Sequence, residues 1–255
     1  MRETQPCKVP RLKTLLEPIL KGNPLLVGGL EGKLPGMAVV DDLEAPTSCL
    51  LRMEFLGGTY FTCSDQAFLE GALTLARGQG EVRLIFEHPD VSDLIAPDGA
   101  IEEWVNVTFT YRPKPDTPAP AIPDECRLVP IDQKLVKRCM WNDFEDLSNP
   151  VPEFHGSAFG YALMRDNEIL CEAWAPFWAG GMVEIGIVTA EKHQRKGYAT
   201  VACEHLTREC ERLGWHPVWH TSTENTGSMG VARRLGFRGE RVGPGYLYPA
   251  ADGTD

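Results

Sequence analysis

The 255-residue sequence lacks the features that mark several protein classes. It has no run of about 18 apolar residues, so no membrane-spanning helix is predicted. Its first residues hold no apolar segment followed by a small-residue cleavage site, so we expect no secretory signal and a cytoplasmic location. The eight cysteines form no C-x-x-C pair and the histidines are scattered. We therefore expect buried, reduced thiols and no metal site.

Basic residues are in deficit. The 25 Lys and Arg stand against 36 Asp and Glu, which gives a net charge of −11. Such a chain repels phosphate backbones and anionic lipid, so neither nucleic acid nor a membrane is an expected partner. The charge favours a cationic small molecule. The 43% hydrophobic and 24% charged residues are typical of a globular protein.

One segment divides the chain. Residues 112–124 contain five prolines in thirteen positions, which prevents both a helix and a central strand. We therefore predict an N-terminal domain at 1–112, a proline-rich linker at 113–125 and a C-terminal domain at 126–255.

The first domain is predicted to be a small α/β unit. Apolar spacing indicates helices at Val9–Leu20 and Ser64–Arg77. The strands expected between and after them are Gly36–Val40, Ser48–Phe55, Gly57–Thr62, Val82–Phe86 and Trp104–Tyr111. No catalytic constellation is recognisable in this half.

The second domain also alternates strands and helices. Helices are predicted at Tyr198–Leu213 and Asn225–Leu235, each ended by a glycine, Gly214 or Gly236. The expected strands are Ala158–Met164, Ile169–Ala175, Met182–Thr189, Pro217–Ser222 and Tyr246–Tyr248.

The segment Gln194–Ala199 joins a predicted strand to a predicted helix. Gly197 permits a tight backbone turn, and the first N–H groups of the helix point outward without partners. Together with the helix dipole they suit a pyrophosphate, and Arg195 and Lys196 add positive charge. A simple turn and helix cap is the alternative interpretation.

The order of these elements resembles the GNAT superfamily of acetyl-CoA-dependent N-acetyltransferases. Gln194, Gly197 and Ala199 match its [Q/R]-x-x-G-x-[G/A] signature, and Asn225 opens a helix that ends in Leu-Gly-Phe237. The resemblance extends loosely upstream, toward the branch that contains the zwittermicin A resistance acetyltransferase. It implies an α/β fold with a mixed, splayed central sheet. The smaller N-terminal α/β domain could be a degenerate copy of that fold.

The resemblance also implies a donor site for acetyl-CoA. The strand Met182–Thr189 should separate from Pro217–Ser222, so that the pantetheine arm lies between them. A backbone N–H near Val188 would polarise the thioester. The residues that would contact the donor are Ile187, Val188, Thr189, Gln194, Arg195, Lys196, Gly197, Tyr198, Ala199, Thr200, Asn225 and Ser228.

The acceptor amine needs a base, and the resemblance indicates Glu184. A strand residue that faces water is the alternative for Glu184, and Glu172, His155 and His220 are weaker candidates. Many relatives carry a tyrosine acid seven residues after the asparagine. Ala232 stands there in this sequence, so we expect Ser228 to donate to the leaving sulfur instead, directly or through water. A hydroxyl bonded to its own backbone is the alternative for Ser228.

Two clusters of aromatic residues have two possible roles, in the active site or in core packing. Tyr246 and Tyr248 could line an acceptor pocket or pack in the core, and Trp174–Trp178 could hold a cation or pack at a strand end. The expected function is acetyl transfer from acetyl-CoA to a primary amine of a small molecule, in a ternary complex. A homodimer is left open. The alternatives are a non-catalytic acyl-CoA sensor and a protein or peptide N-acetyltransferase.

Overall fold

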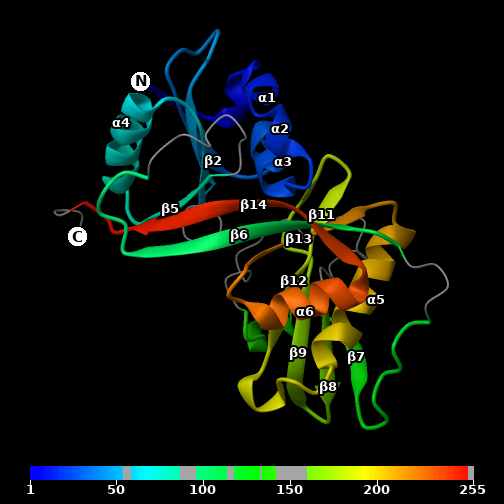
Figure 1. Cartoon of the computed structure of the whole chain (residues 1–255). Helices are drawn as coiled ribbons and strands as arrows, with labels where there is room; N and C mark the ends of the chain where they lie inside the picture. The colour runs from blue at the N-terminus through cyan, green and yellow to red at the C-terminus, as the bar shows by residue number, and fades with distance from the viewer. Residues whose placement is uncertain (54–58, 87–95, 114–117, 133, 142–159, 252–255) are drawn as a thin grey trace. The chain divides into compact units, whose positions relative to one another are not determined.

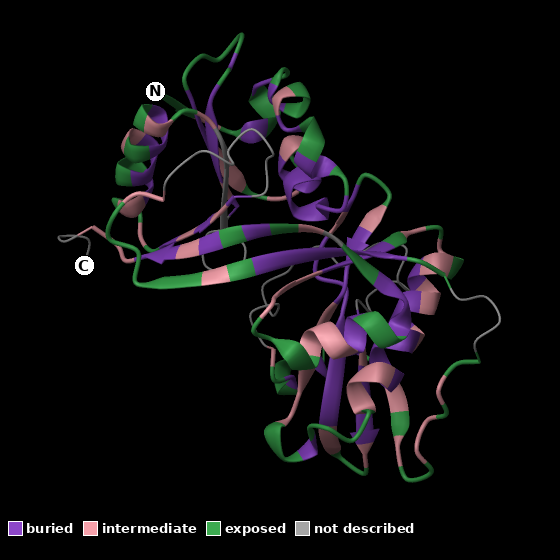
Figure 2. Ribbon diagram, in the orientation of Figure 1, coloured by how far each residue is buried: buried purple, intermediate pink, exposed green. Residues whose placement is uncertain are grey.

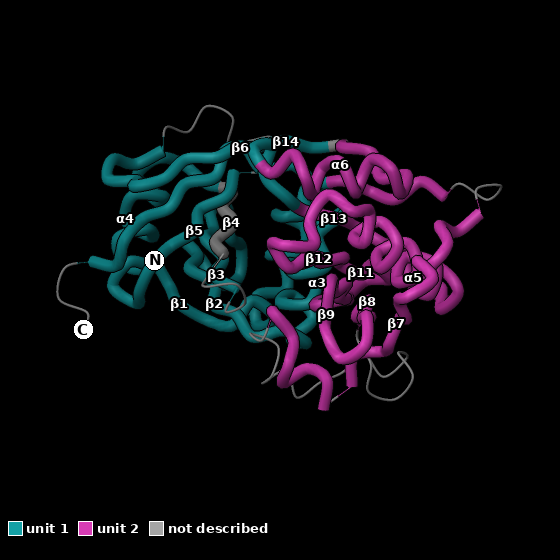
Figure 3. The backbone as a smooth tube through the Cα atoms, turned by 90° about the horizontal axis from the view of Figure 1, so that it is seen from below, with its two compact units in different colours: residues 1–108, 221–224, 240–255 teal, residues 109–220, 225–239 magenta. Residues whose placement is uncertain are grey.

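The computed structural model describes residues 1–53, 59–86, 96–113, 118–132, 134–141 and 160–251. The chain forms two compact units (Figure 3): unit 1 holds 1–108, 221–224 and 240–255, and unit 2 holds 109–220 and 225–239. The last residues therefore belong with the N-terminal half. The sequence predicts domains at 1–112 and 126–255, that is, parts of the chain that fold independently. These boundaries remain a prediction. In the described part of 112–124 there is neither helix nor strand, as the prolines predict.

Unit 1 is built on a mixed sheet (Figure 1). Its strands lie in the order β1 (Arg2–Thr4), β2 (Gly36–Val40), β3 (Cys49–Met53), β4 (Thr59–Cys63), β5 (Val82–Ile85), β14 (Phe237–Tyr248) and β6 (Glu102–Tyr111). Neighbours from β1 to β4 are antiparallel, whereas β4 and β5 are parallel. On β3, Cys49, Leu50, Leu51 and Met53 are at most 1% exposed, so both faces of this strand are covered.

Helices cover the two faces of this sheet (Figure 1). The helix α4 (Gln66–Arg77) lies on one side, and the short helices lie on the other: η1 (Pro6–Lys8), α1 (Leu12–Leu15), α2 (Glu17–Leu20) and α3 (Pro24–Leu30). The prediction of one helix over Val9–Leu20 is wrong, because Pro18 lies in the first turn of a separate helix. The helix α3 was not predicted, although the Asn23 side chain caps it by accepting from the Leu26 N–H at 3.1 Å.

Unit 2 contains an antiparallel four-stranded sheet in the order β12 (Gly186–Thr189), β9 (Glu168–Trp174), β8 (Gly160–Arg165) and β7 (Arg127–Pro130). Three further strands are β10 (Trp178–Ala179), β11 (Met182–Glu184) and β13 (His216–Ser222). The helix α5 (Tyr198–Arg212) packs on β8 and β9, and α6 (Thr226–Leu235) packs on α5. Short 3-10 helices lie at η3 (Val136–Arg138) and η4 (Glu191–His193).

The helices of unit 2 confirm their predictions. On α5, Ala202, Leu206 and Cys210 form a fully buried stripe. Figure 2 shows that buried, intermediate and exposed stretches alternate along the helices. Gly214 and Gly236 follow the two helices in the left-handed conformation, with φ of +81° and +102°. The strand predicted at Tyr246–Tyr248 is much longer, since β14 begins at Phe237 despite its glycines and Pro244.

The same order of elements occurs in both units. In unit 1, three antiparallel strands β2–β4 are followed by α4 and by β5, which is parallel to β4. In unit 2, β8, β9 and β12 are antiparallel, and α5 leads to β13, which is parallel to β11. The chain thus has the mixed α/β fold that the sequence predicts. The same order of elements occurs once in each unit.

Most of the described cysteines are buried thiols, as the sequence predicts: Cys49, Cys139, Cys171, Cys203 and Cys210. Two depart from the expectation, because Cys7 is exposed and Cys126 is half-buried. Among the described residues, no helix has both the length and the apolar character needed to cross a membrane.

Candidate active site

The parallel strands β11 and β13 of unit 2 separate after Ile185. Up to that point β11 runs parallel to β13, with Glu184 opposite Val218, and the Ile185 N–H donates to Val218 O at 3.0 Å. From Gly186 onward the chain pairs with β9 instead, and β12 forms the edge of the four-stranded sheet. Met182–Thr189 is thus two strands rather than one, and the predicted separation from β13 is confirmed.

The edge strand β12 turns some of its backbone groups outward. The Ala190 N–H donates to Leu170 O at 3.1 Å. Since an antiparallel ladder bonds every second pair, Val188 and Gly186 also bond to β9. The N–H and C=O groups of Ile187 and Thr189 therefore point away from the sheet. Gln194 Nε2 reaches the outward Thr189 O at 3.4 Å.

The loop after β12 leads to the N-terminus of α5. Arg195 and Gly197 take the left-handed conformation, with φ of +60° and +82°. No side chain caps the helix at Gly197. Within the described part of the chain, no acceptor meets the N–H groups of residues 198–200, and an added Cβ on Gly197 would have open space around it. Three backbone donors and the positive end of the helix dipole thus face an open position that suits an anion.

A buried histidine braces this loop. His193 is 5% exposed, and its Nε2 lies 3.0 Å from Glu168 Oε1 at the start of β9. Its Nδ1 lies 3.4 Å from Lys196 Nζ, and Lys192 also pairs with Glu168. The hydrogen bonds from Lys192 and His193 lower the pKa of Glu168 to about 2. No local pattern predicts this contact, because Glu168 lies 25 residues before His193.

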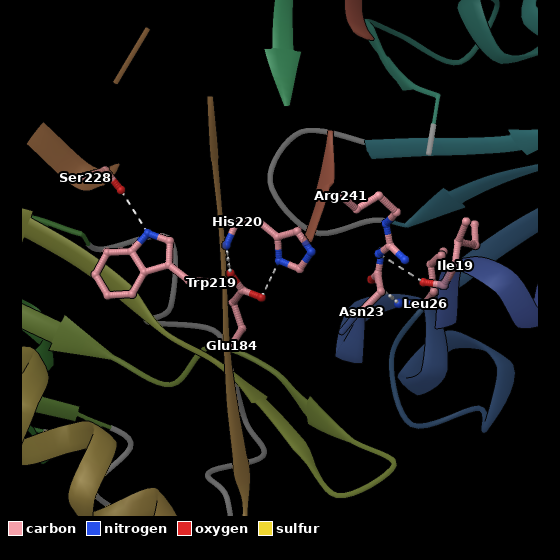
Figure 4. Close-up of polar contacts among 8 residues, drawn as sticks. All are labelled: Ile19, Asn23, Leu26, Glu184, Trp219, His220, Ser228 and Arg241. Atoms are coloured by element: carbon pink, nitrogen blue, oxygen red, sulfur yellow. Dashed lines mark hydrogen bonds and ion pairs between the residues drawn. The ribbon is translucent and has the colours of Figure 1, made fainter. Parts of the chain in front are cut away.

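Glu184 is bonded to a residue of the neighbouring strand (Figure 4). Its Oε1 accepts the His220 N–H at 3.0 Å, and its Oε2 lies 2.7 Å from His220 Nδ1. The two side chains meet because Glu184 is opposite Val218, and His220 follows two residues later on the same face. If Nδ1 donates to the carboxylate, Nε2 is the basic nitrogen of the neutral ring. Glu184 is 9% exposed, so it is not the water-facing strand residue of the alternative interpretation.

The start of α6 carries the other two expected polar residues. The Asn225 side chain caps the helix by accepting the Ser228 N–H at 3.0 Å. The Trp219 indole donates to Ser228 Oγ at 2.9 Å (Figure 4), rather than the hydroxyl bonding its own backbone. Asn225 keeps its NH₂ group, and Ser228 keeps its hydroxyl hydrogen, for donation elsewhere.

The family model described as GNAT acetyltransferase matches residues 15–244.

The chain belongs to the GNAT acetyltransferase family. Acetyl transfer is therefore its activity.

Individual relatives of this GNAT acetyltransferase support the same family assignment. An uncharacterized N-acetyltransferase of Bacillus subtilis, YdfB, is 24% identical over 221 residues, covering 82% of this chain and 84% of that protein. A GCN5-related N-acetyltransferase-like protein from Streptococcus suis has a similar fold, with a TM-score of 0.69, 18% identity and coverage of 95% and 99%. A GCN5-related N-acetyltransferase from Sphaerobacter thermophilus gives a TM-score of 0.67 at 11% identity, covering 100% and 96%.

Several residues that were weaker candidates for the active site have contacts typical of packing in this acetyltransferase. Tyr248 is fully buried in unit 1 and donates to Pro97 O at 2.8 Å, and the Tyr246 ring meets Phe86 edge-on. Trp174 is also fully buried, so it packs rather than holding a cation. His155 lies outside the described residues. In the described ranges, no group of three or more His, Cys, Asp or Glu could hold a metal ion.

Glu172 is a buried carboxylate with three donors. It is fully buried in β9 and accepts from the Met140 N–H at 2.7 Å, the Trp141 N–H at 3.3 Å and the Trp174 indole at 3.2 Å. Burial and the charge of Glu172 raise the pKa of the Cys139 thiol. These bonds attach Met140 and Trp141 to β9, a contact that the sequence did not indicate.

Proposed function

We propose that this GNAT chain transfers the acetyl group of acetyl-CoA directly to a primary amine of a small molecule, in a ternary complex. One observation carries the proposal: the outward edge of β12 leads into the open N-terminus of α5. The first feature suits an extended arm with amide groups, and the second suits a pyrophosphate.

The donor would lie along this path with its pyrophosphate at the start of α5 and its arm along β12. Its pyrophosphate would bind Arg195, Lys196 and the N–H groups that follow Gly197, with Gln194, Tyr198, Ala199 and Thr200 around it. Its arm would bond to the outward groups of Ile187 and Thr189, with Val188 between them. Asn225 would add its NH₂ group. The open space at Gly197 and the absence of a side-chain cap support this fit.

The thioester would then lie near the beginning of β12. Among the backbone groups near Val188, the ladder turns the N–H of Ile187 outward, which makes it the donor available to the thioester oxygen. Such a donor stabilises the charge that develops on the oxygen when the amine attacks.

Glu184 would take the proton from the acceptor amine. Each carboxylate oxygen accepts one N–H from His220 and still has a lone pair for a water or an amine. The His220 contact supports this role because it fixes the orientation of the carboxylate. Ser228 would donate a hydrogen bond to the departing sulfur, directly or through a water that supplies the proton, since its oxygen already accepts from Trp219.

The acceptor is proposed to be small and cationic before it reacts. The net charge of −11 supports a basic ligand over an anionic one. We also propose that the chain belongs to the branch that contains the zwittermicin A resistance acetyltransferase. We propose further that it forms a homodimer.

Donor binding tests the proposal, with two matched glycine variants. Gly197 and Gly214 flank α5, both have φ near +80°, and neither would meet a neighbour through an added Cβ. Gly197→Trp should weaken the binding of acetyl-CoA at least about 100-fold, because the side chain fills the anion position. Gly214→Trp, with the same backbone cost, should bind acetyl-CoA as the native chain does.

Isothermal titration calorimetry with acetyl-CoA measures both variants. Thiol release in the presence of polyamines and amino sugars then tests turnover. If the native chain binds no acetyl-CoA, or if both tryptophan variants lose affinity equally, the donor site proposed here is wrong. Tight binding without thiol release from any amine would instead favour an acyl-CoA sensor.

A further inference from the structure

We propose that Trp141 limits the acyl group of the donor to acetyl. This inference rests on the proposed function, since it requires an acyl-CoA that lies along β12. It concerns the far end of that donor, where the acyl chain would point.

The indole of Trp141 lies directly on Gly186, the first residue of β12. A Cβ placed on Gly186 would overlap the ring, with Trp141 Cη2 at 2.9 Å and Cζ3 nearer still. Real Cβ atoms essentially never make contacts of that length, so with the ring in this position residue 186 must be glycine. Trp141 thus covers the point at which β12 leaves β11.

Glu172 fixes the backbone that carries this ring. The carboxylate is fully buried and accepts the N–H groups of Met140 and Trp141. Because a buried charge without donors is costly, these bonds hold the segment firmly. Glu172 is opposite Val188 in the ladder, so its side chain lies on the same face of the sheet as those of Val188 and Gly186. Trp141 is therefore held on one defined face of β12.

The direction of the donor brings its acyl group to this ring. From the anion position before α5, the arm would run back along Thr189 and Ile187 toward Gly186. An acetyl group ends there. A longer chain would need the space that the indole occupies, and one methylene in an apolar pocket changes binding by about 10-fold or more.

The experiment compares the affinities of three ligands, CoA, acetyl-CoA and butyryl-CoA, by isothermal titration calorimetry. The native chain should prefer acetyl-CoA to butyryl-CoA. Trp141→Ala should reduce that preference at least about 10-fold and leave the affinity for CoA unchanged. Trp215→Ala removes a half-buried indole at the other end of α5 and should keep the native preference.

Two further variants protect the test against a folding defect. Trp141→Phe keeps an aromatic ring of smaller size and should give part of the shift. Glu172→Gln leaves at least one N–H without an acceptor and should move the preference in the same direction, which a purely structural role would not do. If Trp141→Ala is unfolded, the phenylalanine variant decides.

The inference is overturned if the folded Trp141 variants discriminate between acetyl-CoA and butyryl-CoA as the native chain does. Failure of the proposed function has a different signature, because the native chain would then bind none of the three ligands. Binding of CoA with unaltered acyl preference in the variants contradicts only the role of Trp141.

Discussion

Single residues of this chain take their roles from partners that lie far away in sequence. Glu184 was selected by its place in a motif, yet its carboxylate is oriented by His220, 36 residues later. The register of β11 and β13 places His220 on the same face as Glu184. In the proposed reaction this pair orients the carboxylate of Glu184 toward the acceptor amine.

Glu184→Gln should lower kcat about 100-fold or more, because the amide cannot accept a proton from the amine. Its affinity for acetyl-CoA should stay within about 2-fold of the native value, since the side chain contacts no proposed donor group. Steady-state thiol release and calorimetry measure the two quantities.

Glu204→Gln is the matched control for this variant. Glu204 is 8% exposed, close to the 9% of Glu184, and it pairs with Arg208 on α5. Its loss should leave kcat near the native value. Equal losses in both variants would mean that Glu184 supports the fold and not the reaction.

At the scale of elements, the N-terminus of α6 combines a structural and a binding group in one side chain. The oxygen of Asn225 caps the helix, and its NH₂ group remains for the donor arm. Asn225→Asp keeps the cap and removes the NH₂ group. It should retain the native melting temperature but weaken acetyl-CoA binding about 3- to 10-fold, the effect of one hydrogen bond.

Asn225→Ala removes both groups and is the comparison. It should also lose about 1 kcal/mol of stability, measured by thermal unfolding, because the Ser228 N–H loses its acceptor. If the aspartate variant binds acetyl-CoA like the native chain, Asn225 acts as a cap alone.

The brace between β9 and the loop before α5 predicts a dependence of stability on pH. The pKa of Glu168 falls from its ordinary 4.5 to about 2 through its bonds with Lys192 and His193. A lowered carboxyl pKa stabilises the fold above pH 4.5, and this contribution is lost as the pH falls toward 2. Glu168→Gln should therefore unfold at a lower temperature than the native chain at pH 7, with a difference that shrinks toward pH 2. A constant difference across this window would contradict the prediction.

At the scale of the whole molecule, the order of elements of unit 2 recurs in unit 1, but the anion position does not. The helix α4 follows β4 after two residues, and Asp65 caps it by accepting the Phe68 N–H at 2.8 Å. A carboxylate at that place repels phosphate. We propose that unit 1 is a degenerate copy that binds no donor.

Calorimetry should therefore give one acetyl-CoA per chain, and Asp65→Asn should leave that number unchanged because the rest of the loop is missing. Two equivalents per chain in the native protein would contradict the proposal of a degenerate copy.

Local patterns predicted the elements whose stability comes from their own sequence. The helices α4, α5 and α6 and the glycines that follow α5 and α6 were all readable in this way. Two predictions failed for different reasons. Pro18 splits the first helix, a local effect that the apolar spacing concealed. The strand β14 extends beyond its sequence pattern because it lies between β5 and β6, whose residues are distant in the chain.

By itself the sequence determined the α/β class, the family resemblance and the loop that precedes α5, because these depend on residues close together in the chain. Only the tertiary structure decided which groups meet: Glu184 with His220, Glu168 with His193, and Trp141 with Gly186. The reason is that strand register and sheet order bring residues from different segments together, and neither can be read from one segment alone.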